Sequence, residues 1–388
     1  MPHFDQLGAR FGVNYLPREN WWYAWAEDDD TFAEDLHQIA ALGFDHVRVQ
    51  CLWPLFQPNP SWVSPRALRR LVHLLDRAAE NGLDVCVTVL DGWLSGFDFR
   101  PCWLADVDPF TDPEAVDAAE LLVGAVARAV EGHPALWCVD VANEPNVLMR
   151  HLKAGEGEAW AARMLGAARA AAVPVTVGVD HVPWMSDDVP IGRAFLAGAC
   201  DLIPVHAWPY FTGALARVGE ERAWAIPDYL SQVARATAGA AGKPLWIQEV
   251  GVSPLWLADV AVEDFAERML RRAAAIPGLG AVTWWASHDI SRRFTGFDEL
   301  EYGLGLIDAE GRTKPVGARV AEVVAELRDR PRVRTAAETA MVPPSGQAGE
   351  PAIVLPTGRA PDIDFAEEWF AHMGATVGPA IELERSVS

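Results

Sequence analysis

The sequence predicts an α/β fold, a single (β/α)8 TIM barrel followed by a short C-terminal extension. Two observations predict it. Short apolar runs rich in Val, Ile and Leu alternate along the chain with helical patterns, which is the signal for parallel βαβ units. The runs predicted as strands number eight, the count that closes such a barrel, and they are Arg10–Tyr15, His46–Leu52, Asp84–Leu90, Leu136–Ala142, Pro174–Val179, Leu202–His206, Pro244–Val250 and Ala281–Ala286.

Capping signals mark where helices begin between these strands. Thr31-Phe-Ala-Glu34 matches a capping box, in which the Thr and Glu side chains each bond to a backbone N–H of the first helical turn. Ser64-Pro65 and Asp112-Pro113 each combine an N-cap residue with a first-turn proline. These three places therefore predict the starts of three helices.

The chain divides into two predicted parts. Residues 1–334 hold the barrel, and residues 335–388 form a linker and a C-terminal extension expected to pack on the barrel or on a neighbouring subunit. Residues 335–349 have the Ala, Pro, Gly and Thr content of a linker. Beyond them, Ala352–Leu355 is a short β-like run and Phe365–Met373 is amphipathic. This pattern is compatible with a homo-oligomer formed through the extension.

The composition is that of an acidic globular protein. Lys and Arg total 32 against 54 Asp and Glu, which gives a formal net charge of −22. Such a charge repels nucleic acid and anionic membrane surfaces, so neither is an expected partner. No run approaches the ~18 consecutive apolar residues of a membrane span, and the first residues lack the regions of a signal peptide. We therefore expect a cytoplasmic protein.

Cysteine usage predicts neither disulfides nor a metal centre. The five cysteines are an odd number without metal-ligand spacing and are expected to be reduced thiols; they are Cys51, Cys86, Cys102, Cys138 and Cys200. No His-x-His follows the first strand, which argues against a metal-dependent barrel hydrolase. The sequence thus predicts no cofactor and no metal.

Tryptophan is unusually frequent, with 17 in the chain, and many follow the ends of predicted strands. Trp is a flat apolar ring with one N–H donor, suited to stacking on the C–H faces of sugar rings. Trp137 and Trp246 lie in mid-strand and are expected to pack in the core instead. An oligosaccharide is therefore the expected partner.

Polar and aromatic residues mark the strand ends where a barrel builds its active site. That face lies at the carboxyl ends of the strands, because the βα loops form it. Glu144 follows the fourth predicted strand, and Glu249 lies at the end of the seventh. The other candidate side chains near these ends are Arg48, Trp53, Asn143, His206, Trp208, Tyr210, Trp284, Trp285, His288 and Asp289.

Glu144 and Glu249 are a pair suited to glycoside hydrolysis, in which one carboxyl protonates the departing oxygen and the other attacks the anomeric carbon. The fourth and seventh strands lie nearly opposite across the barrel, so both side chains can reach one bond. A separation of ~5–5.5 Å would indicate retention of configuration. Arg48 is expected to keep Glu249 ionised, while Glu144 keeps the higher pKa.

Each feature alone also has a purely structural interpretation. Asn143-Glu144-Pro145 is a common capped turn, a glutamate before Val-Gly is usually on the surface, and a lone histidine such as His206 is more often a core residue. Arg48 is harder to explain this way, since a buried arginine needs a partner. Their joint placement at strand ends favours a site.

These residues resemble clan A glycoside hydrolases, and most closely family 5. The resemblance implies a retaining hydrolase with Glu144 as acid/base and Glu249 as nucleophile. It also implies that Asn143 binds the 2-hydroxyl group and that Arg48 and His206 support the carboxylates. The matching pieces are Gly12-Val-Asn-Tyr15, Val47-Arg48-Val49, Asn143-Glu144-Pro145, His206, Glu249 and Trp284-Trp285.

The chain departs from the family pattern in two places. Family 5 usually has His-x-Tyr after the sixth strand, where this chain has His206-Ala-Trp208 with Tyr210 two residues later. Many members have a histidine after the third strand, where this chain has Asp91-Gly-Trp93. A tyrosine contact to Glu249 is therefore not carried over.

Several segments resemble subfamily 18 of family 5, which implies an exo-acting β-mannosidase. Such an enzyme releases non-reducing-end mannose from short oligosaccharides such as mannose-β-1,4-N-acetylglucosamine. Mannose has an axial 2-hydroxyl group, and Asn143 is the leading candidate to recognise it, with Asp91, Trp93, His288 and Asp289 as candidate wall residues. The matching segments are Asp91–Trp103, Gly12–Pro17 with Trp21-Trp22, Leu52-Trp53-Pro54, and Glu249-Val-Gly251 followed by Trp256.

Two alternatives remain open from the sequence. An endo-β-1,4-glucanase or mannanase on the same fold needs an open cleft, whereas the long loops Asp91–Thr111 and Ser287–Gly303 favour closure of one end. The expected lack of secretion also argues against an enzyme that degrades polymers outside the cell. A non-catalytic carbohydrate-binding barrel is the second alternative, and the presence of both glutamates argues against it.

Overall fold

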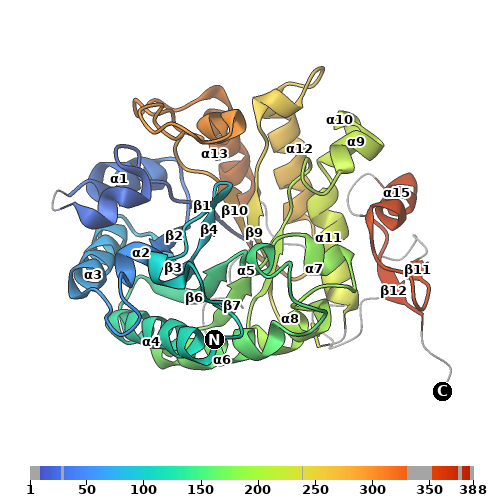
Figure 1. Cartoon of the computed structure of the whole chain (residues 1–388). Coiled ribbons are helices and arrows are strands. Elements are labelled where there is room, and N and C mark those ends of the chain that lie inside the picture. Colours follow the sequence, from blue (N-terminus) through green and yellow to red (C-terminus); the bar gives the residue numbers. More distant parts are fainter. Residues whose placement is uncertain (1–8, 28–29, 238, 330–351, 375–377, 385–388) are drawn as a thin grey trace.

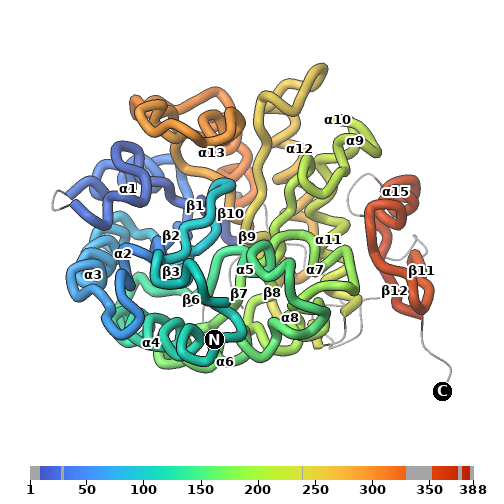
Figure 2. Tube along the Cα trace, viewed as in Figure 1, coloured from blue at the N-terminus to red at the C-terminus, as the bar shows by residue number. Residues whose placement is uncertain are grey.

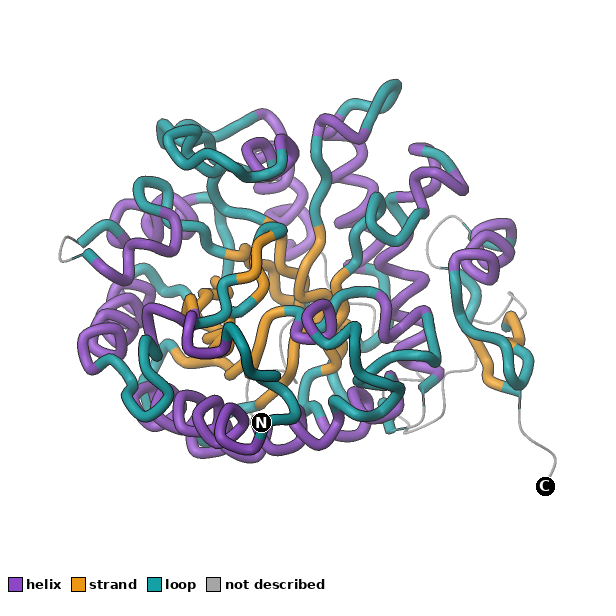
Figure 3. The backbone as a smooth tube through the Cα atoms, in the orientation of Figure 1, coloured by secondary structure: helices purple, strands orange, loops and turns teal. Residues whose placement is uncertain are grey.

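Eight parallel strands form one barrel sheet at the centre of the molecule, and helices surround it (Figure 1, Figure 3). The computed structural model describes residues 9–27, 30–237, 239–329, 352–374 and 378–384. Neighbouring strands follow the order β7-β6-β3-β2-β1-β10-β9-β8, and the predicted (β/α)8 fold is confirmed. The strands are β1 Arg10–Asn14, β2 His46–Leu52, β3 Asp84–Asp91, β6 Leu136–Asn143, β7 Val175–Gly178, β8 Ile203–His206, β9 Leu245–Val250 and β10 Leu279–Trp285.

One longer helix follows each barrel strand, as βα alternation requires. These helices are α1 Phe32–Ala41, α3 Pro65–Glu80, α4 Pro113–Val130, α6 Glu158–Ala168, α8 Arg193–Ala199, α11 Ile226–Ala236, α12 Val262–Ala274 and α13 Pro315–Asp329. Shorter elements lie in the loops. They are η1 Trp21–Ala26, α2 Trp53–Phe56, the hairpin strands β4 Trp93–Leu94 and β5 Phe97–Asp98, η2 Cys102–Leu104, α5 Pro145–Leu148, η3 Arg169–Ala171, α7 Val182–Met185, α9 Ala214–Val218, α10 Glu220–Ala223, η4 Pro254–Trp256 and η5 Glu299–Gly303.

Two of the three predicted helix caps are confirmed. The Ser64 hydroxyl accepts from the N–H of Ala67 at 3.2 Å, and the Asp112 carboxylate accepts from two N–H groups at the start of α4. The prediction of a capping box at Thr31 is wrong, because the Thr31 side chain makes no capping hydrogen bond, although α1 begins at the next residue. Thr31 already has helical dihedrals, φ −82° and ψ −7°, whereas a capping side chain needs an extended backbone to reach the following N–H groups.

An apolar floor closes the amino-terminal half of the barrel. The rings of Trp137 and Trp246 lie 4.9 Å apart between centroids, and the Trp246 indole N–H donates to Thr283 Oγ1 at 2.7 Å. Both tryptophans therefore pack in the core, as predicted. The floor consists of Cys86, Trp137, Cys138, Leu202, Trp246 and Ala281.

The junction between β7 and β8 differs from the other strand pairs. Ile203 N–H donates to Pro244 O on the β9 side, so the next residue, Pro204, faces β7, where its nitrogen has no hydrogen to donate. Side-chain hydrogen bonds replace part of the backbone ladder between the two strands. Thr176 Oγ1 donates to Leu202 O at 2.9 Å, and Trp184 Nε1 donates to Pro204 O at 3.0 Å.

The C-terminal segment lies against the outside of the barrel beside α9 and α11 (Figure 2). It contains β11 Ile353–Leu355, α15 Ile363–Ala371 and β12 Ile381–Leu383. Asp228 in α11 is buried, accepts from Gly378 N–H at 2.7 Å and pairs with Arg272 at 2.7 Å. The segment thus completes the surroundings of a buried carboxylate. The linker predicted at residues 335–349 lies outside the described residues.

All five cysteines are free thiols, as predicted. None of the helices in the described part of the chain combines the length and apolarity that a bilayer-spanning segment needs.

Candidate active site

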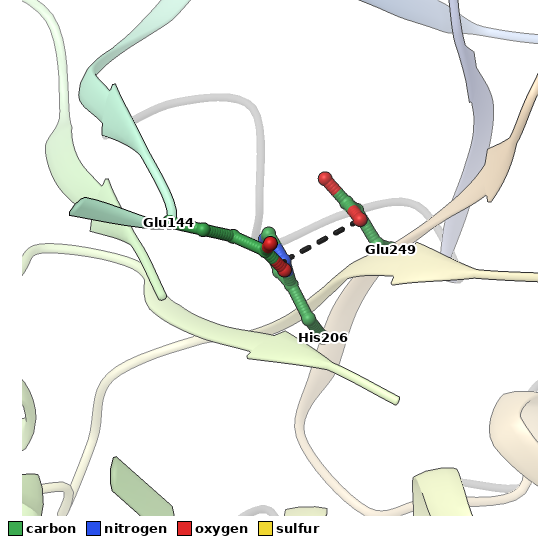
Figure 4. A group of neighbouring side chains, drawn as sticks. All are labelled: Glu144, His206 and Glu249. Atoms are coloured by element: carbon green, nitrogen blue, oxygen red, sulfur yellow. Dashed lines mark hydrogen bonds and ion pairs between the residues drawn. The ribbon is translucent and has the colours of Figure 1, made fainter. Parts of the chain in front are cut away.

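Two glutamates and a histidine meet at the carboxyl ends of the strands. Glu144 follows β6, His206 ends β8 and Glu249 lies in β9, and their side chains converge from three directions (Figure 4). One oxygen of each carboxyl and one ring nitrogen of His206 lie within 4.8 Å of one another. The structure therefore brings together three of the residues that the sequence placed at strand ends.

Glu144 stands in an uncommon backbone conformation. Its φ of 42° and ψ of 46° are left-handed, which costs a non-glycine residue about 1 kcal/mol. The Glu144 N–H donates to Gly178 O at 2.8 Å, and Pro145 begins α5 directly afterwards. The chain thus changes direction at Glu144, between the end of β6 and the start of this helix.

Arg48 organises the barrel interior below the carboxyl pair, and all five of its N–H groups donate. Nη1 donates to Glu249 Oε1 at 2.8 Å and to Asn14 Oδ1 at 3.0 Å. Nη2 donates to Asn143 Oδ1 at 2.7 Å, and both Nε and Nη2 donate to Asp140 Oδ2. Burial lowers the pKa of Arg48, but Asp140 and Glu249 outweigh it and raise the pKa further above its ordinary value. Arg48 is therefore a fixed positive charge.

Asp140 is the central acceptor of this polar layer. Besides Arg48, it accepts from Thr88 Oγ1 at 3.1 Å, Gln248 Nε2 at 2.9 Å and Gly178 N at 2.7 Å. A Cβ at Gly178 would lie 2.6 Å from Gln248 Oε1 and 3.0 Å from Asp140 Oδ2. Only glycine therefore allows the polar layer to approach β7 this closely.

The hydrogen-bond network assigns the proton on His206. Gln248 donates through Nε2 to Asp140, so its Oε1 is free to accept from His206 Nε2 at 3.0 Å. Burial lowers the pKa of His206, although Glu249 acts in the opposite direction. The neutral ring then carries its hydrogen on Nε2, and Nδ1 accepts. Because Glu144 Oε1 lies 2.7 Å from Nδ1, the proton in that hydrogen bond belongs to Glu144.

The two carboxyls have unequal surroundings. Burial, followed by the charge of Asp180, raises the pKa of Glu144 to about 8. Burial also raises the pKa of Glu249, but His206, Arg48 and the Trp208 indole N–H favour its charged form. The charge of Arg48 also lowers the pKa of Glu144, but the hydrogen bonds of Arg48 and Trp208 go to Glu249. The geometry therefore favours a protonated Glu144 beside an ionised Glu249, the division of roles that acid/base and nucleophile require.

Trp208 takes the position beside Glu249 where the family pattern has a tyrosine. Its indole Nε1 donates to Glu249 Oε2 at 3.2 Å. Tyr210 does not reach this carboxylate; its ring stacks on Trp256 at 5.1 Å and is 52% exposed. The hydrogen bond to the expected nucleophile thus comes from an indole rather than a phenol.

Glu144, His206 and Glu249 are also a conceivable ligand set for a metal ion, with two carboxylates and one imidazole. The 2.7 Å between His206 Nδ1 and Glu144 Oε1 is a hydrogen-bond distance. Ligands around a metal at ~2.0–2.2 Å stand about 3 Å apart or more. The arrangement is therefore that of hydrogen-bonded groups.

Asn143, Trp93 and Trp285 lie with the carboxyl pair. Asn143 Nδ2 donates to the Trp93 carbonyl at 2.7 Å, which fixes the amide and leaves one N–H of that group for another acceptor. Trp285 pairs in register with Asn14, whose side chain points inward to Arg48. Paired residues face the same side of a sheet, so Trp285 faces the barrel mouth.

Four other candidates have structural surroundings of their own. Trp284 alternates with Trp285, is 2% exposed and belongs to the main hydrophobic core. Trp53 Nε1 donates to Gln57 Oε1 at 2.9 Å. His288 Nδ1 lies 3.0 Å from Ser287 Oγ, and Asp289 pairs with Lys314 at 2.8 Å. The structure does not place these four side chains against Glu144 or Glu249.

Asp91 is fully buried at the end of β3, and neither of its carboxyl oxygens has a hydrogen-bond partner within the described residues. Burial raises its pKa well above the ordinary value; Arg48 acts against this shift, and Glu249 and Glu144 add to it. Burial thus favours the neutral form of this carboxyl, and the side chain has no exposed surface at the barrel mouth.

Aromatic side chains extend the site on the β8 and β9 side. We call Tyr210, Phe211 and Trp256 the aromatic platform. Trp256 packs edge-on against Trp208 at 5.9 Å and stacks with Tyr210 at 5.1 Å. Phe211 is 48% exposed. The platform therefore runs outward from the indole that touches Glu249 and presents apolar rings to solvent.

Aromatic rings from three loops meet at the side of β1, β3 and β10. Trp21 follows β1, Phe97 and Phe99 follow β3, and Phe297 follows β10; we call these four rings the loop junction. Phe297 lies 5.0 Å from Phe97 and 5.3 Å from Trp21, and Trp21 lies 5.2 Å from Phe99. The long loops singled out in the sequence thus meet each other through aromatic contacts.

Sequence reasoning missed several residues of this site. Asp140 and Gln248 are polar residues inside strands, and the rule applied to Arg48, that a buried charge needs a partner, would have flagged Asp140. Asp180, which acts on Glu144, lies in a loop whose sequence has no periodic pattern. No local signal could have found this acid.

Comparisons with known proteins agree with this geometry. A family model described as Cellulase (glycosyl hydrolase family 5) matches residues 5–198. A search of curated protein sequences found no match.

Several solved structures are similar over nearly the whole chain. A GH5_18 protein from Streptomyces cattleya, solved with GlcNAc, shares 34% identity at a TM-score of 0.87, covering 97% of this chain and 94% of its own. A variant of that protein was solved with Manβ1-4GlcNAc at the same identity, TM-score and coverage. A GH5_18 protein from Bifidobacterium longum subsp. infantis shares 29% identity at a TM-score of 0.88, covering 98% and 92%.

Proposed function

The chain belongs to glycoside hydrolase family 5, and from that premise we propose that it is a retaining, exo-acting β-mannosidase. In this proposal Glu249 is the nucleophile and Glu144 the acid/base. The observation that carries the assignment is the unequal environment of the two carboxyls. Arg48 and Trp208 donate to Glu249, whereas Glu144 faces the acceptor nitrogen of a neutral histidine.

The first chemical step forms a glycosyl-enzyme. A carboxylate oxygen of Glu249 attacks the anomeric carbon while the bond from that carbon to the glycosidic oxygen breaks. Glu144 gives its proton to the departing oxygen, and the alcohol leaves. The ester removes the negative charge of Glu249, so the pKa of Glu144 falls and its carboxylate becomes a base.

The second step releases the sugar. Glu144 takes a proton from a water molecule as that water attacks the anomeric carbon, and the Glu249 carboxylate leaves. Retention follows because each of the two displacements inverts the anomeric carbon, the carboxylate attacking one face and the water the other. The proximity of the carboxyl oxygens, within 4.8 Å, supports this route, because inverting enzymes hold their carboxyls ~6.5–9.5 Å apart to admit the water.

The exo mode is supported by the two unlike ends of the mouth. The loop junction closes the side of β1, β3 and β10, and the aromatic platform opens the side of β8 and β9. The sugar to be released occupies the closed side, above Trp285. The leaving sugar occupies the open side, where exposed rings can stack on it.

The preference for mannose is supported by the likeness to a Streptomyces cattleya protein whose variant was solved with Manβ1-4GlcNAc. Mannose differs from glucose in the axial 2-hydroxyl group. Asn143, fixed by Trp93 and Arg48, has one N–H left for that hydroxyl. A site whose buried polar group is paired by one epimer discriminates strongly against the other.

The test compares p-nitrophenyl β-mannoside with the β-glucoside, β-galactoside and β-xyloside. The mannoside should have the highest kcat/KM, and mannosyl-N-acetylglucosamine should give free mannose. Mannohexaose should lose one terminal mannose at a time. A preference for the glucoside, or mid-chain cleavage of the hexaose, would reject the exo-mannosidase and favour an endo-enzyme; no cleavage of any glycoside would favour a binding protein.

A further inference from the structure

The aromatic platform is built from two separate loops. Tyr210 and Phe211 lie in the loop after β8, and Trp256 ends η4 in the loop after β9. The rings of Tyr210 and Trp256 are nearly parallel, with 9° between their planes and 5.1 Å between their centroids. Phe211 packs edge-on against Trp256 at 5.6 Å. The platform therefore depends on a fixed position of one loop relative to the other.

One carboxylate joins the two loops. Glu220 begins α10, in the segment that follows the platform residues of the loop after β8. Its Oε1 accepts from Ala258 N–H at 2.6 Å, and its Oε2 accepts from the N–H groups of Val260 at 2.8 Å and Asp259 at 3.1 Å. Three successive backbone donors of the loop after β9 thus converge on one side chain, and the first of them lies two residues after Trp256.

These contacts differ from those of an ordinary surface acid. Hydrogen bonds from backbone N–H groups to a carboxylate are roughly twice as strong as those between neutral groups. The N–H groups of Ala258 and Val260 lower the pKa of Glu220, so its carboxylate is charged at neutral pH. Glu221, the next residue of α10, is exposed and pairs with Arg268 at 2.8 Å, a kind of contact that contributes little. Of the two adjacent acids, only Glu220 binds the backbone of the other loop.

Trp256 lies between two anchors. On the strand side Ser253 is buried; its hydroxyl accepts from Leu255 N–H at 3.2 Å, and its carbonyl accepts from Trp256 N–H at 3.0 Å. This anchor lies within the loop after β9 and cannot set the distance of that loop from its neighbour. The second anchor, at Glu220, does set this distance, because it crosses from α10 to the backbone beyond Trp256.

The platform is continuous with the carboxyl pair through Trp208. Trp256 packs edge-on against Trp208 at 5.9 Å, and the Trp208 indole donates to Glu249 Oε2 at 3.2 Å. A chain of direct contacts therefore runs from the carboxylate of Glu220 to the carboxylate of Glu249.

We propose that Glu220 is a positioning residue for the leaving sugar: by fixing the loop after β9 against α10, it keeps Trp256 stacked on Tyr210 in the orientation that receives that sugar. This inference rests on the proposed function, in which the leaving sugar binds on the platform. Glu220 itself contacts neither the sugar nor the reacting atoms. It contributes preorganisation, because rings that are already ordered lose less conformational entropy when a ligand binds.

The experiment compares two mannosides whose leaving groups are both alcohols, so that both need the proton of Glu144. Mannosyl-N-acetylglucosamine releases a sugar that can stack on the platform, whereas methyl β-mannoside releases methanol, which has no ring. Glu220→Ala, Trp256→Ala and the double variant are assayed beside the wild type, with kcat and KM determined separately. Glu221→Ala is the matched control, because it removes the adjacent carboxylate of the same helix. Urea unfolding of each protein checks the fold.

Glu220→Ala should lower kcat/KM on mannosyl-N-acetylglucosamine by about 3- to 10-fold, mainly through KM, the range for ordering one or two side chains. Its kcat/KM on methyl β-mannoside should stay close to that of the wild type. Glu221→Ala should match the wild type on both substrates.

The double variant decides whether Glu220 acts through Trp256. Since Trp256→Ala already removes the platform, the further change at Glu220 should add little to the loss. This comparison uses the disaccharide alone, so it decides even where methanol is released too slowly to measure. Unaltered kinetics of Glu220→Ala, additive losses in folded proteins, or equal losses on the two mannosides would overturn the inference and leave the proposed function standing. A wild type inert on the disaccharide would overturn both.

Discussion

The Nδ1 atom of His206 lies 2.7 Å from Glu144 Oε1, and the proton between them belongs to the carboxyl. The loss of this proton from Glu144 determines how kcat/KM falls at high pH. Because only protonated Glu144, with a pKa of about 8, can assist the leaving group, kcat/KM should fall tenfold per pH unit above about pH 8. Glu144→Gln should remove this limb on an activated aryl glycoside. An unchanged limb in that variant would assign the proton to another group.

Glu144→Ala should separate good leaving groups from poor ones. An aryl oxygen departs with little protonation, so its rate should fall by less than about tenfold, whereas a sugar leaving group should lose roughly 10²–10⁴-fold. The measurement is the rate of glycosyl-enzyme formation on 2,4-dinitrophenyl β-mannoside and on mannosyl-N-acetylglucosamine. Equal losses on the two substrates would contradict the acid role.

Glu249→Ala should reduce turnover by roughly three orders of magnitude or more while the protein stays folded, because the attacking oxygen is gone. Azide or formate can occupy the vacated volume and restore part of the activity. Proton NMR of the wild-type reaction should show the β-anomer first. Near-normal activity of the variant, or an α-anomer appearing first, would reject the nucleophile and the retaining course respectively.

Trp208→Phe should change the pH profile through Glu249. The indole N–H stabilises the charged carboxylate, so its removal raises the pKa of Glu249. The acid limb of kcat/KM should therefore move up by about one pH unit, the equivalent of ~1.4 kcal/mol. Trp103→Phe is the control, since that indole donates to the Gln57 carbonyl instead. A fall in rate without any movement of the limb would mean that Trp208 only packs.

Asp140→Asn should destabilise the barrel itself. The carboxylate is the main counter-charge of buried Arg48, and breaking a buried ion pair costs about 3–5 kcal/mol. Urea unfolding should show this loss as a lower midpoint. Asp117→Asn, which removes an exposed partner of Arg163, should stay within about 0.5 kcal/mol of the wild type. Similar midpoints for the two variants would mean that Arg48 finds another partner.

The fold was predictable because apolar periodicity and capping residues act locally. Ser64 and Asp112 cap their helices as their sequence neighbours suggest. Thr31 does not, because its backbone is already helical and only the surrounding fold decides that. Strand ends could be found within two residues for the same local reason.

The site was only partly predictable. Arg48 and Glu249 were expected to pair, and they do. The sequence could not tell that Trp208 rather than Tyr210 would reach Glu249, because the choice depends on how the chain turns after β8. It also could not find Asp180, whose charge raises the pKa of Glu144 although the two residues follow different strands.

The junction between β7 and β8 is the place where the barrel wall has the fewest backbone hydrogen bonds between neighbouring strands. Other neighbouring strands share a hydrogen-bonded ladder, whereas here one backbone bond, from Asp201 N–H to Val175 O, stands beside the side-chain bonds of Thr176 and Trp184. Opening the ring costs least where fewest backbone bonds must break, so amide exchange should begin here. His206 lies on β8, and Gly178, whose carbonyl accepts from the Glu144 N–H, lies on β7. Local opening between β7 and β8 would therefore separate His206 from Glu144, while the ion pair between Arg48 and Glu249 stays intact.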